Sequence, residues 1–180
     1  MDTILGNIEA TPQAAGSALV LQFDLARMPI RWALCAVIAD FYSEYLVASG
    51  ALDRLAVEQR HSIGYVLNEL VENAVKFNAG PRIAVEVSRR PEGLVLTVSN
   101  GLKLAEMDRV KASFSSLIAG DPGELLLRKI EQNALGGDGG SGIGYLTLMS
   151  DYGVVLGWRF ERDAEDPGMV TLSTVAQLSL

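Results

Sequence analysis

The stretch from Ile63 to Phe77 constrains the fold most strongly, because it displays two faces of a single helix. Glu69, Asn73 and Lys76 follow one another at i, i+4, i+7 and therefore stand in one row on the helix surface. On another face, apolar residues recur at the spacing of a helix packed against a core: Ile63, Val66, Leu67, Leu70, Val71, Ala74 and Val75. The sequence predicts a long helix that begins near residues 51–53 and ends at Phe77.

The polar row combines a carboxylate, a carboxamide and an ammonium group. Most rows of this kind are solvated helix faces that carry no function. The same groups also suit a site for a metal-bound phosphate, since a carboxylate accepts protons and an amide oxygen is a hard donor for Mg²⁺. The row alone leaves both interpretations open.

A glycine run, Gly136 to Gly144, precedes the apolar segment Tyr145–Met149. Such a run presents bare backbone N–H groups at a helix N-terminus, which favours an anion. It matches the dinucleotide fingerprint by letter, but a predicted helix rather than a strand comes before it. The chain has no GxxxxGK[ST] motif, so it is not a P-loop protein. A flexible linker is the alternative interpretation of the run.

Together these motifs resemble those of a known superfamily. Glu69-x-x-x-Asn73-Ala74-x-Lys76-Phe77 is similar to the N box of the GHKL superfamily of ATP-binding domains, which have the Bergerat fold. Gly140-Ser141-Gly142-Ile143-Gly144 resembles its glycine-rich second box. The glutamate at position 69 is similar to that of gyrase and of stand-alone serine kinases that act as anti-sigma factors. The run Ser141–Gly153, with His61-Ser62-Ile63, looks closest to small bacterial partner-switching proteins of the SiaB type.

The resemblance implies ATP and Mg²⁺ as ligands. Asn73 would hold the metal and Glu69 would act in catalysis, accepting the proton of the incoming hydroxyl. Lys76 and the second box would bind the triphosphate, the box through Gly140, Ser141, Gly142, Ile143 and Gly144.

The adenine-binding box departs from the family pattern Asp-x-Gly-x-Gly. Ser99 stands where the aspartate is expected, Asn100 and Gly101 follow, and Lys103 replaces the second glycine. A serine hydroxyl accepts a bond about half as strong as one to a carboxylate. Strand alternation is expected to point Asn100 to the other face of the sheet. Thr171 is similar to a threonine that supports the base in relatives.

Three functions remain compatible with these residues. The resemblance implies a protein-serine/threonine kinase that phosphorylates a STAS-type antagonist protein in bacterial partner switching, with a PP2C-type phosphatase in the same pathway. Ser99 favours the alternative, a nucleotide-impaired binding module that sequesters a partner without phosphoryl transfer. An ATP hydrolase that drives a conformational change, as in gyrase, fits least well, because no second domain is predicted.

The expected fold is α+β, a two-layer sandwich of helices over a mixed, mostly antiparallel sheet. Residues 1–16 are expected to be a flexible N-terminus and residues 17–180 a single ATP-binding domain with a lid at about 102–139. Strand alternation and turn residues place the remaining elements: strands at 18–25, 83–87, 94–98, 154–161 and 169–178, and helices at 30–47, 104–118 and 122–135.

Composition narrows the class of protein. The chain has 15 Lys and Arg against 22 Asp and Glu, a net charge of −7 without a dominant basic patch, which argues against nucleic acid as a partner. The N-terminus lacks the pattern of a signal peptide, and charged residues interrupt the apolar segment Ile30–Ala48, so a cytoplasmic protein without a membrane span is expected. Cys35, the single cysteine, has no partner for an internal disulfide.

The segment Ile30–Val47 is apolar over a wider arc than one core contact requires. With the strand at 18–25 it predicts a self-association surface and a homodimer. A helix fully buried inside the monomer is the competing interpretation.

Overall fold

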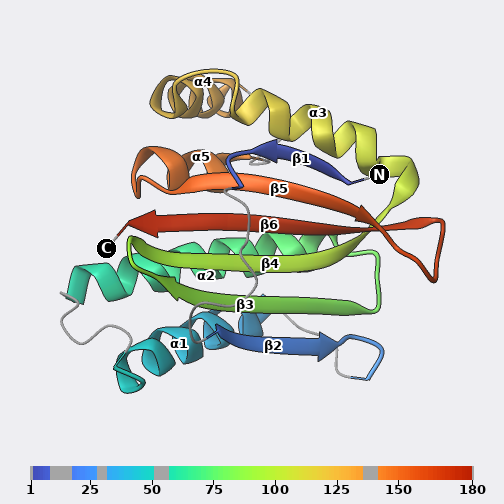
Figure 1. Ribbon diagram of the computed structural model, residues 1–180. Coiled ribbons are helices and arrows are strands. Elements are labelled where there is room, and N and C mark those ends of the chain that lie inside the picture. Colours follow the sequence, from blue (N-terminus) through green and yellow to red (C-terminus); the bar gives the residue numbers. More distant parts are fainter. Residues whose placement is uncertain (1, 9–17, 28–31, 51–56, 136–141, 180) are drawn as a thin grey trace.

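Six strands form one sheet in a computed structural model of the chain, which describes residues 2–8, 18–27, 32–50, 57–135 and 142–179. The strands lie in the order β1-β5-β6-β4-β3-β2 (Figure 1), and all the described pairings are antiparallel. Their bounds are β1 Thr3–Gly6, β2 Ala18–Asp24, β3 Arg82–Arg90, β4 Gly93–Lys103, β5 Val155–Arg162 and β6 Met169–Ser179.

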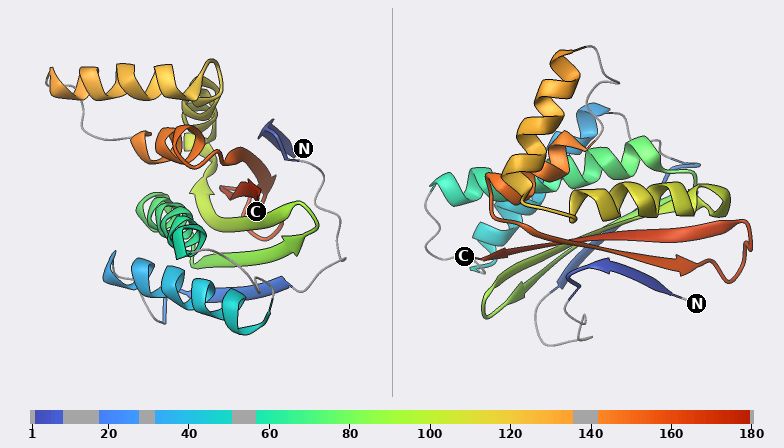
Figure 2. Two further views of the ribbon diagram at one scale, coloured as in Figure 1. Left: turned by 90° about the vertical axis from the view of Figure 1, so that its left-hand side faces the viewer. Right: turned by 90° about the horizontal axis from the view of Figure 1, so that it is seen from above.

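The helices cover one face of this sheet, as the two turned views in Figure 2 show. α2 contacts β4 and β3 and lies beside α1, while α4 packs on α5. The bounds are α1 Trp32–Ala48, α2 Val57–Phe77, α3 Met107–Leu117, α4 Pro122–Ala134 and α5 Ile143–Ser150, with the 3₁₀ turn η1 at Leu104–Glu106. The expected α+β sandwich is therefore confirmed.

The core lies between the sheet and α2. The apolar row of α2 is buried except for Val75, which is partly buried. Alternate residues of β4 meet this row, namely Leu94, Leu96, Val98 and Leu102. Removing this apolar area from water supplies the main driving force for folding.

The predicted N-terminus needs correction. Residues 3–6, expected to be flexible, form edge strand β1, which pairs with β5 from Thr3↔Phe160 to Gly6↔Gly157. The segment expected to be a lid, at about 102–139, begins at the end of β4, which continues through Lys103; residues 136–139 lie outside the described part of the chain.

The turn after α2 is fastened to β4. Asn78 Oδ1 accepts hydrogen bonds from the backbone N–H groups of Gly80 and Gly101, at 3.1 and 2.9 Å. Gly80 and Gly101 approach so closely that a Cβ on either would meet the backbone of the other within 3.0 Å. The end of α2 is thereby fixed against β4, which sets the distance between their polar side chains.

α1 is buried along only one face. Cys35, Ile38, Ala39, Tyr42 and Leu46 enter the core, whereas the opposite stripe is exposed: Leu34 39%, Val37 59%, Phe41 47% and Tyr45 38%. The interpretation of a fully buried helix is therefore wrong.

Tyr42 ties the edge strand β2 to the sheet. Its buried hydroxyl accepts from Leu21 N–H at 3.1 Å and donates to the carbonyl of Val85. We expect Tyr42→Phe to lower the free energy of unfolding by about 1–3 kcal/mol, because both backbone groups lose a partner away from bulk water. Urea unfolding measures this, with Tyr45→Phe as the exposed control; equal midpoints for the two variants would contradict the role.

Candidate functional site

Two adjoining cavities open beside the polar row of α2. The polar cavity, of about 160 Å³, is lined by Glu69, Glu72, Asn73, Lys76, Gly142 and Gly144 together with Trp32, Phe77 and Tyr145. The apolar cavity, of about 120 Å³, is lined mainly by apolar side chains of α2, α3, β4 and β6. Asn73, Phe77, Gly142 and Tyr145 line both, so the two cavities adjoin and share a wall.

Asn73 stands at the junction of the two cavities. Its Nδ2 donates to the Glu69 carbonyl oxygen, one turn earlier on α2, at 2.8 Å. This bond orients the amide and leaves its oxygen as the group available to a ligand. An amide oxygen in this place suits a hard cation.

Glu69 lies directly against the start of α5. A Cβ added to Gly144 would overlap Glu69 Oε2, so any larger residue here would displace this carboxylate. Gly142, at φ 94°, precedes the first turn of α5. The N–H groups of a first helical turn lack partners within the helix, and they bring the positive end of its dipole to the polar cavity.

The environment of Glu69 favours its neutral form. Desolvation is the main cause that raises the pKa of this carboxyl, the nearby Glu72 carboxylate raises it further, and a hydrogen bond from Tyr65 opposes the shift. A carboxyl with a raised pKa next to an anion-binding helix start is suited to exchange a proton with a bound ligand.

The apolar cavity has an aromatic floor. Phe114 and Tyr145 line it, and both rings pack on the buried indole of Trp158, Phe114 in a stack with centroids 4.3 Å apart. Burial raises the pKa of the Tyr145 hydroxyl to about 12, although a hydrogen bond with Thr174 acts to lower it. The phenol therefore stays neutral, and the floor suits a flat, uncharged ring.

The side chains of Asn100 and Ser99 each point to the face of the sheet opposite to the one expected. Asn100, 4% exposed, continues the buried row of β4 and lines the apolar cavity. Ser99 faces away from the helices, and its hydroxyl bonds that of Ser173 at 2.8 Å. The row Leu94, Leu96, Val98 extends by two residues to position 100, so alternation puts Asn100 on the helix side.

Two further expected residues lie outside both cavities. Thr171 and Gly101 line a separate hollow on the other face of the sheet, with Ser99. On β6 the residues that reach the apolar cavity are Leu172 and Thr174, and Thr174 is the polar one. A glycine is needed at position 101 for a structural reason, because the backbone of Gly80 approaches it too closely to leave room for a Cβ.

The remaining predicted residues divide into two groups. Lys76 lies at the polar cavity, with its Nζ 5.2 Å from the centre of the Phe77 ring. Ile143 begins α5 without lining either cavity. Gly140 and Ser141 lie outside the described residues.

No sequence pattern predicts one residue at the site, Trp32, which is 58% exposed and reaches the polar cavity from the first position of α1. Arg109 on α3 is one of several cations of the predicted lid among which the sequence does not choose. Among the described residues it is the only one of these cations that lines the apolar cavity. No motif marks either residue, because each comes from an element whose position depends on tertiary packing.

In the described part of the chain, no three His, Cys, Asp or Glu side chains come together as a metal site. No helix there combines the length and apolar character that a membrane crossing requires.

Comparison with protein-family models and with curated proteins found no match. Among solved structures, the chain is similar to one in the crystal structure of the SiaB–SiaC complex from Pseudomonas aeruginosa. The similarity has a TM-score of 0.65 and 18% identity, and it covers 88% of each chain. The chain therefore shares the fold of a protein in that complex.

Proposed function

We propose that this protein is an ATP-binding partner-switching regulator that transfers phosphate to a serine or threonine hydroxyl of a STAS-type partner protein. One observation carries the proposal. Glu69 and Asn73 on α2 and the glycine-lined start of α5 surround one polar cavity, which adjoins an aromatic-floored cavity. A carboxylate, a hard oxygen donor, an anion-binding helix start and a flat apolar slot are together what a nucleoside triphosphate requires.

Each residue has a role that follows from its place. Asn73 would hold Mg²⁺ through its amide oxygen, and the metal would supply positive charge against the phosphates. Lys76 and the first turn of α5 bind phosphate oxygens. Glu69 accepts the proton of the incoming hydroxyl. Asn100 and Thr174 present polar groups to the edge of the base.

Two lines of support point to partner switching. The similar solved chain belongs to a complex named for two proteins, SiaB and SiaC, and the fold is shared over 88% of the length. The motifs around Glu69 and Gly144 resemble those of stand-alone serine kinases of the GHKL superfamily.

A second candidate is a binding module that has lost efficient nucleotide use. It is favoured by Ser99, which stands where the family pattern has a carboxylate, and by Asn100, since the β4 side chain that reaches the apolar cavity is a neutral amide. A neutral hydrogen bond to the base is about half as strong as a charged one.

Nucleotide titration by calorimetry separates the two candidates. We expect Mg²⁺-dependent binding of ATP or ADP to the wild-type protein and a loss of at least about tenfold in Asn100→Leu, because a buried donor on the base loses its acceptor. Ser99→Ala is the matched control and should bind like the wild type. Absence of binding at millimolar nucleotide would establish the binding module instead.

We propose a homodimer formed by the exposed stripe of α1 and edge strand β2. Leu34, Val37, Phe41 and Tyr45 present an apolar surface, and β2 pairs only with β3 among the described strands, which leaves one of its edges for a second copy. We expect a dimer in sedimentation at tens of micromolar and a monomer for Phe41→Glu. Leu127→Glu, at an exposed position of α4, is the control; a wild-type monomer would contradict the proposal.

A further inference from the structure

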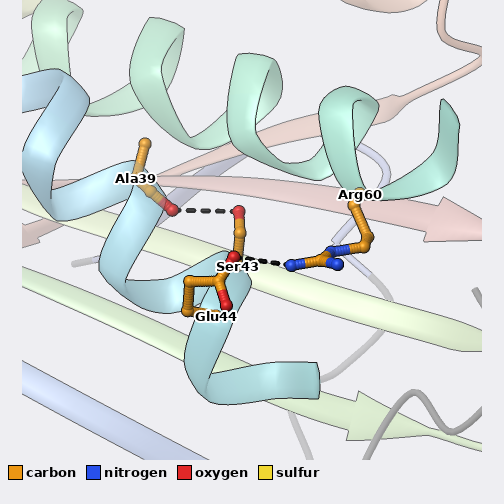
Figure 3. A network of polar contacts seen from close by, with 4 residues as sticks. All are labelled: Ala39, Ser43, Glu44 and Arg60. Carbon is orange, nitrogen blue, oxygen red and sulfur yellow. Dashed lines mark hydrogen bonds and ion pairs between the residues drawn. The ribbon is translucent and has the colours of Figure 1, made fainter. Parts of the chain in front are cut away.

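A further hollow, of about 800 Å³, lies between α1 and α2, and small residues at Ala36, Ala39 and Gly64 line it. At one end, shown in Figure 3, Arg60 of α2 is paired with Glu44 of α1, and Ser43 bonds back to the carbonyl of Ala39. We call this hollow the α1–α2 groove.

Two polar groups in the α1–α2 groove are unmatched. Asp40 is exposed and forms no ion pair with any described residue. Asn68 donates through Nδ2 to Glu72, but its buried Oδ1 has no hydrogen-bond partner in the part of the chain that the structure describes. The groove therefore offers a negative charge and a buried acceptor, which suit an occupant that brings a cation and an N–H donor.

The α1–α2 groove is connected to the polar cavity through two residues of α2. Tyr65 lines the groove, and its hydroxyl is hydrogen-bonded to the Glu69 carboxylate one turn later. Its ring stacks on Tyr152 with centroids 4.9 Å apart, which holds it in place. Asn68 lines the groove and bonds Glu72, which lines the polar cavity. The groove is thus separated by one residue, Tyr65, from the carboxylate proposed as the base.

We infer that the α1–α2 groove binds an extended segment of the phosphoacceptor protein, with a lysine or arginine of that segment paired to Asp40 and its hydroxyl residue delivered past Tyr65 to Glu69. This inference rests on the proposed function. From Arg60 to Asn68 the groove follows eight residues of α2, about 12 Å at 1.5 Å per residue. That length takes about four residues of extended chain. The floor of small side chains leaves room for a backbone, whose N–H groups match the free oxygen of Asn68.

The test uses fluorescein-labelled peptides with a central serine in an alanine–glycine background, each with one lysine or one glutamate two to four residues from the serine. Fluorescence anisotropy measures binding to the full-length protein with MgADP present. We expect a lysine at one of these positions to bind about two- to fivefold tighter than glutamate, the range of an exposed ion pair. Asp40→Lys should reverse this preference. Asp108→Lys, at an exposed position of α3, should retain it.

A second variant tests the volume of the groove independently of charge. Ala36→Trp fills the floor and should weaken binding of the lysine peptide at least about tenfold, whereas Ala112→Trp on α3 should not. The inference is overturned if the wild type does not prefer lysine peptides or if Asp40→Lys still prefers them. It is also overturned if Ala36→Trp binds the lysine peptide as tightly as the wild type does. Selective binding without transfer of labelled phosphate from ATP would uphold the groove and refute the proposed kinase, so the two failures are distinguishable.

Discussion

Glu69→Gln is expected to bind MgATP like the wild type and to transfer phosphate roughly 10²–10⁴-fold more slowly, the usual loss on removing a general base. Glutamine keeps the shape that packs against Gly144. The amide, however, accepts no proton from the acceptor hydroxyl. Single-turnover transfer of labelled phosphate to the STAS-type partner measures the rate, and calorimetry measures nucleotide binding.

Two controls make this result specific to Glu69. Glu72→Gln changes the other carboxylate at the same cavity and should lower the rate less than about tenfold. Because burial raises the pKa of Glu69, wild-type transfer should decline on acidification at a pH above the ordinary range of glutamate, and this decline should be absent in Glu69→Gln. Equal rates for the wild type and Glu69→Gln would show that Glu69 only supports the structure.

Asn73→Ala is expected to remove the Mg²⁺-dependent part of nucleotide affinity, about 10–100-fold, the size of effect seen when the coordination of a metal is disturbed. The fold should persist, since Asn73 is only half-buried and its one described bond is to the adjacent turn of α2. Calorimetry with and without Mg²⁺ measures the difference.

Asn73→Asp keeps an oxygen at the same place and should restore most of the metal-dependent affinity. Asn133→Ala removes an amide from α4, away from both cavities, and should bind as the wild type does. If Asn73→Ala still binds more tightly with Mg²⁺ than without it, the metal is held elsewhere.

Most helices and the central hairpin follow from local patterns. The apolar row of α2 and its polar row both depend on a period of 3.6 residues within one continuous segment, and the structure keeps both. The turn Arg90–Gly93 between β3 and β4 is likewise set by neighbouring residues. Edge strand β1 escaped prediction because its four residues are ordered by β5, more than 150 positions along the chain.

The most consequential error in the prediction concerned the faces of the sheet to which the β4 side chains point. Val95 is apolar and buried like its neighbours, so the segment Leu94–Val98 does not reveal by itself which face meets the helices. The structure places position 100 on the helix side because Leu96, Val98 and Leu102 pack beneath α2. The polar group that reaches the apolar cavity is consequently Asn100 rather than Ser99.

The sequence by itself determined that Glu69, Asn73 and Lys76 share one helix face and that a glycine segment begins a helix, because both features depend on residues within two turns of each other. Only the tertiary structure decided what stands opposite that face. Gly144 meets Glu69, Asn100 and Thr174 reach the adjoining cavity, and Trp32 closes one wall. These contacts join segments that are far apart in the chain. They form because the segments bury apolar side chains against one another, and no repeat in the sequence shows which segments will meet.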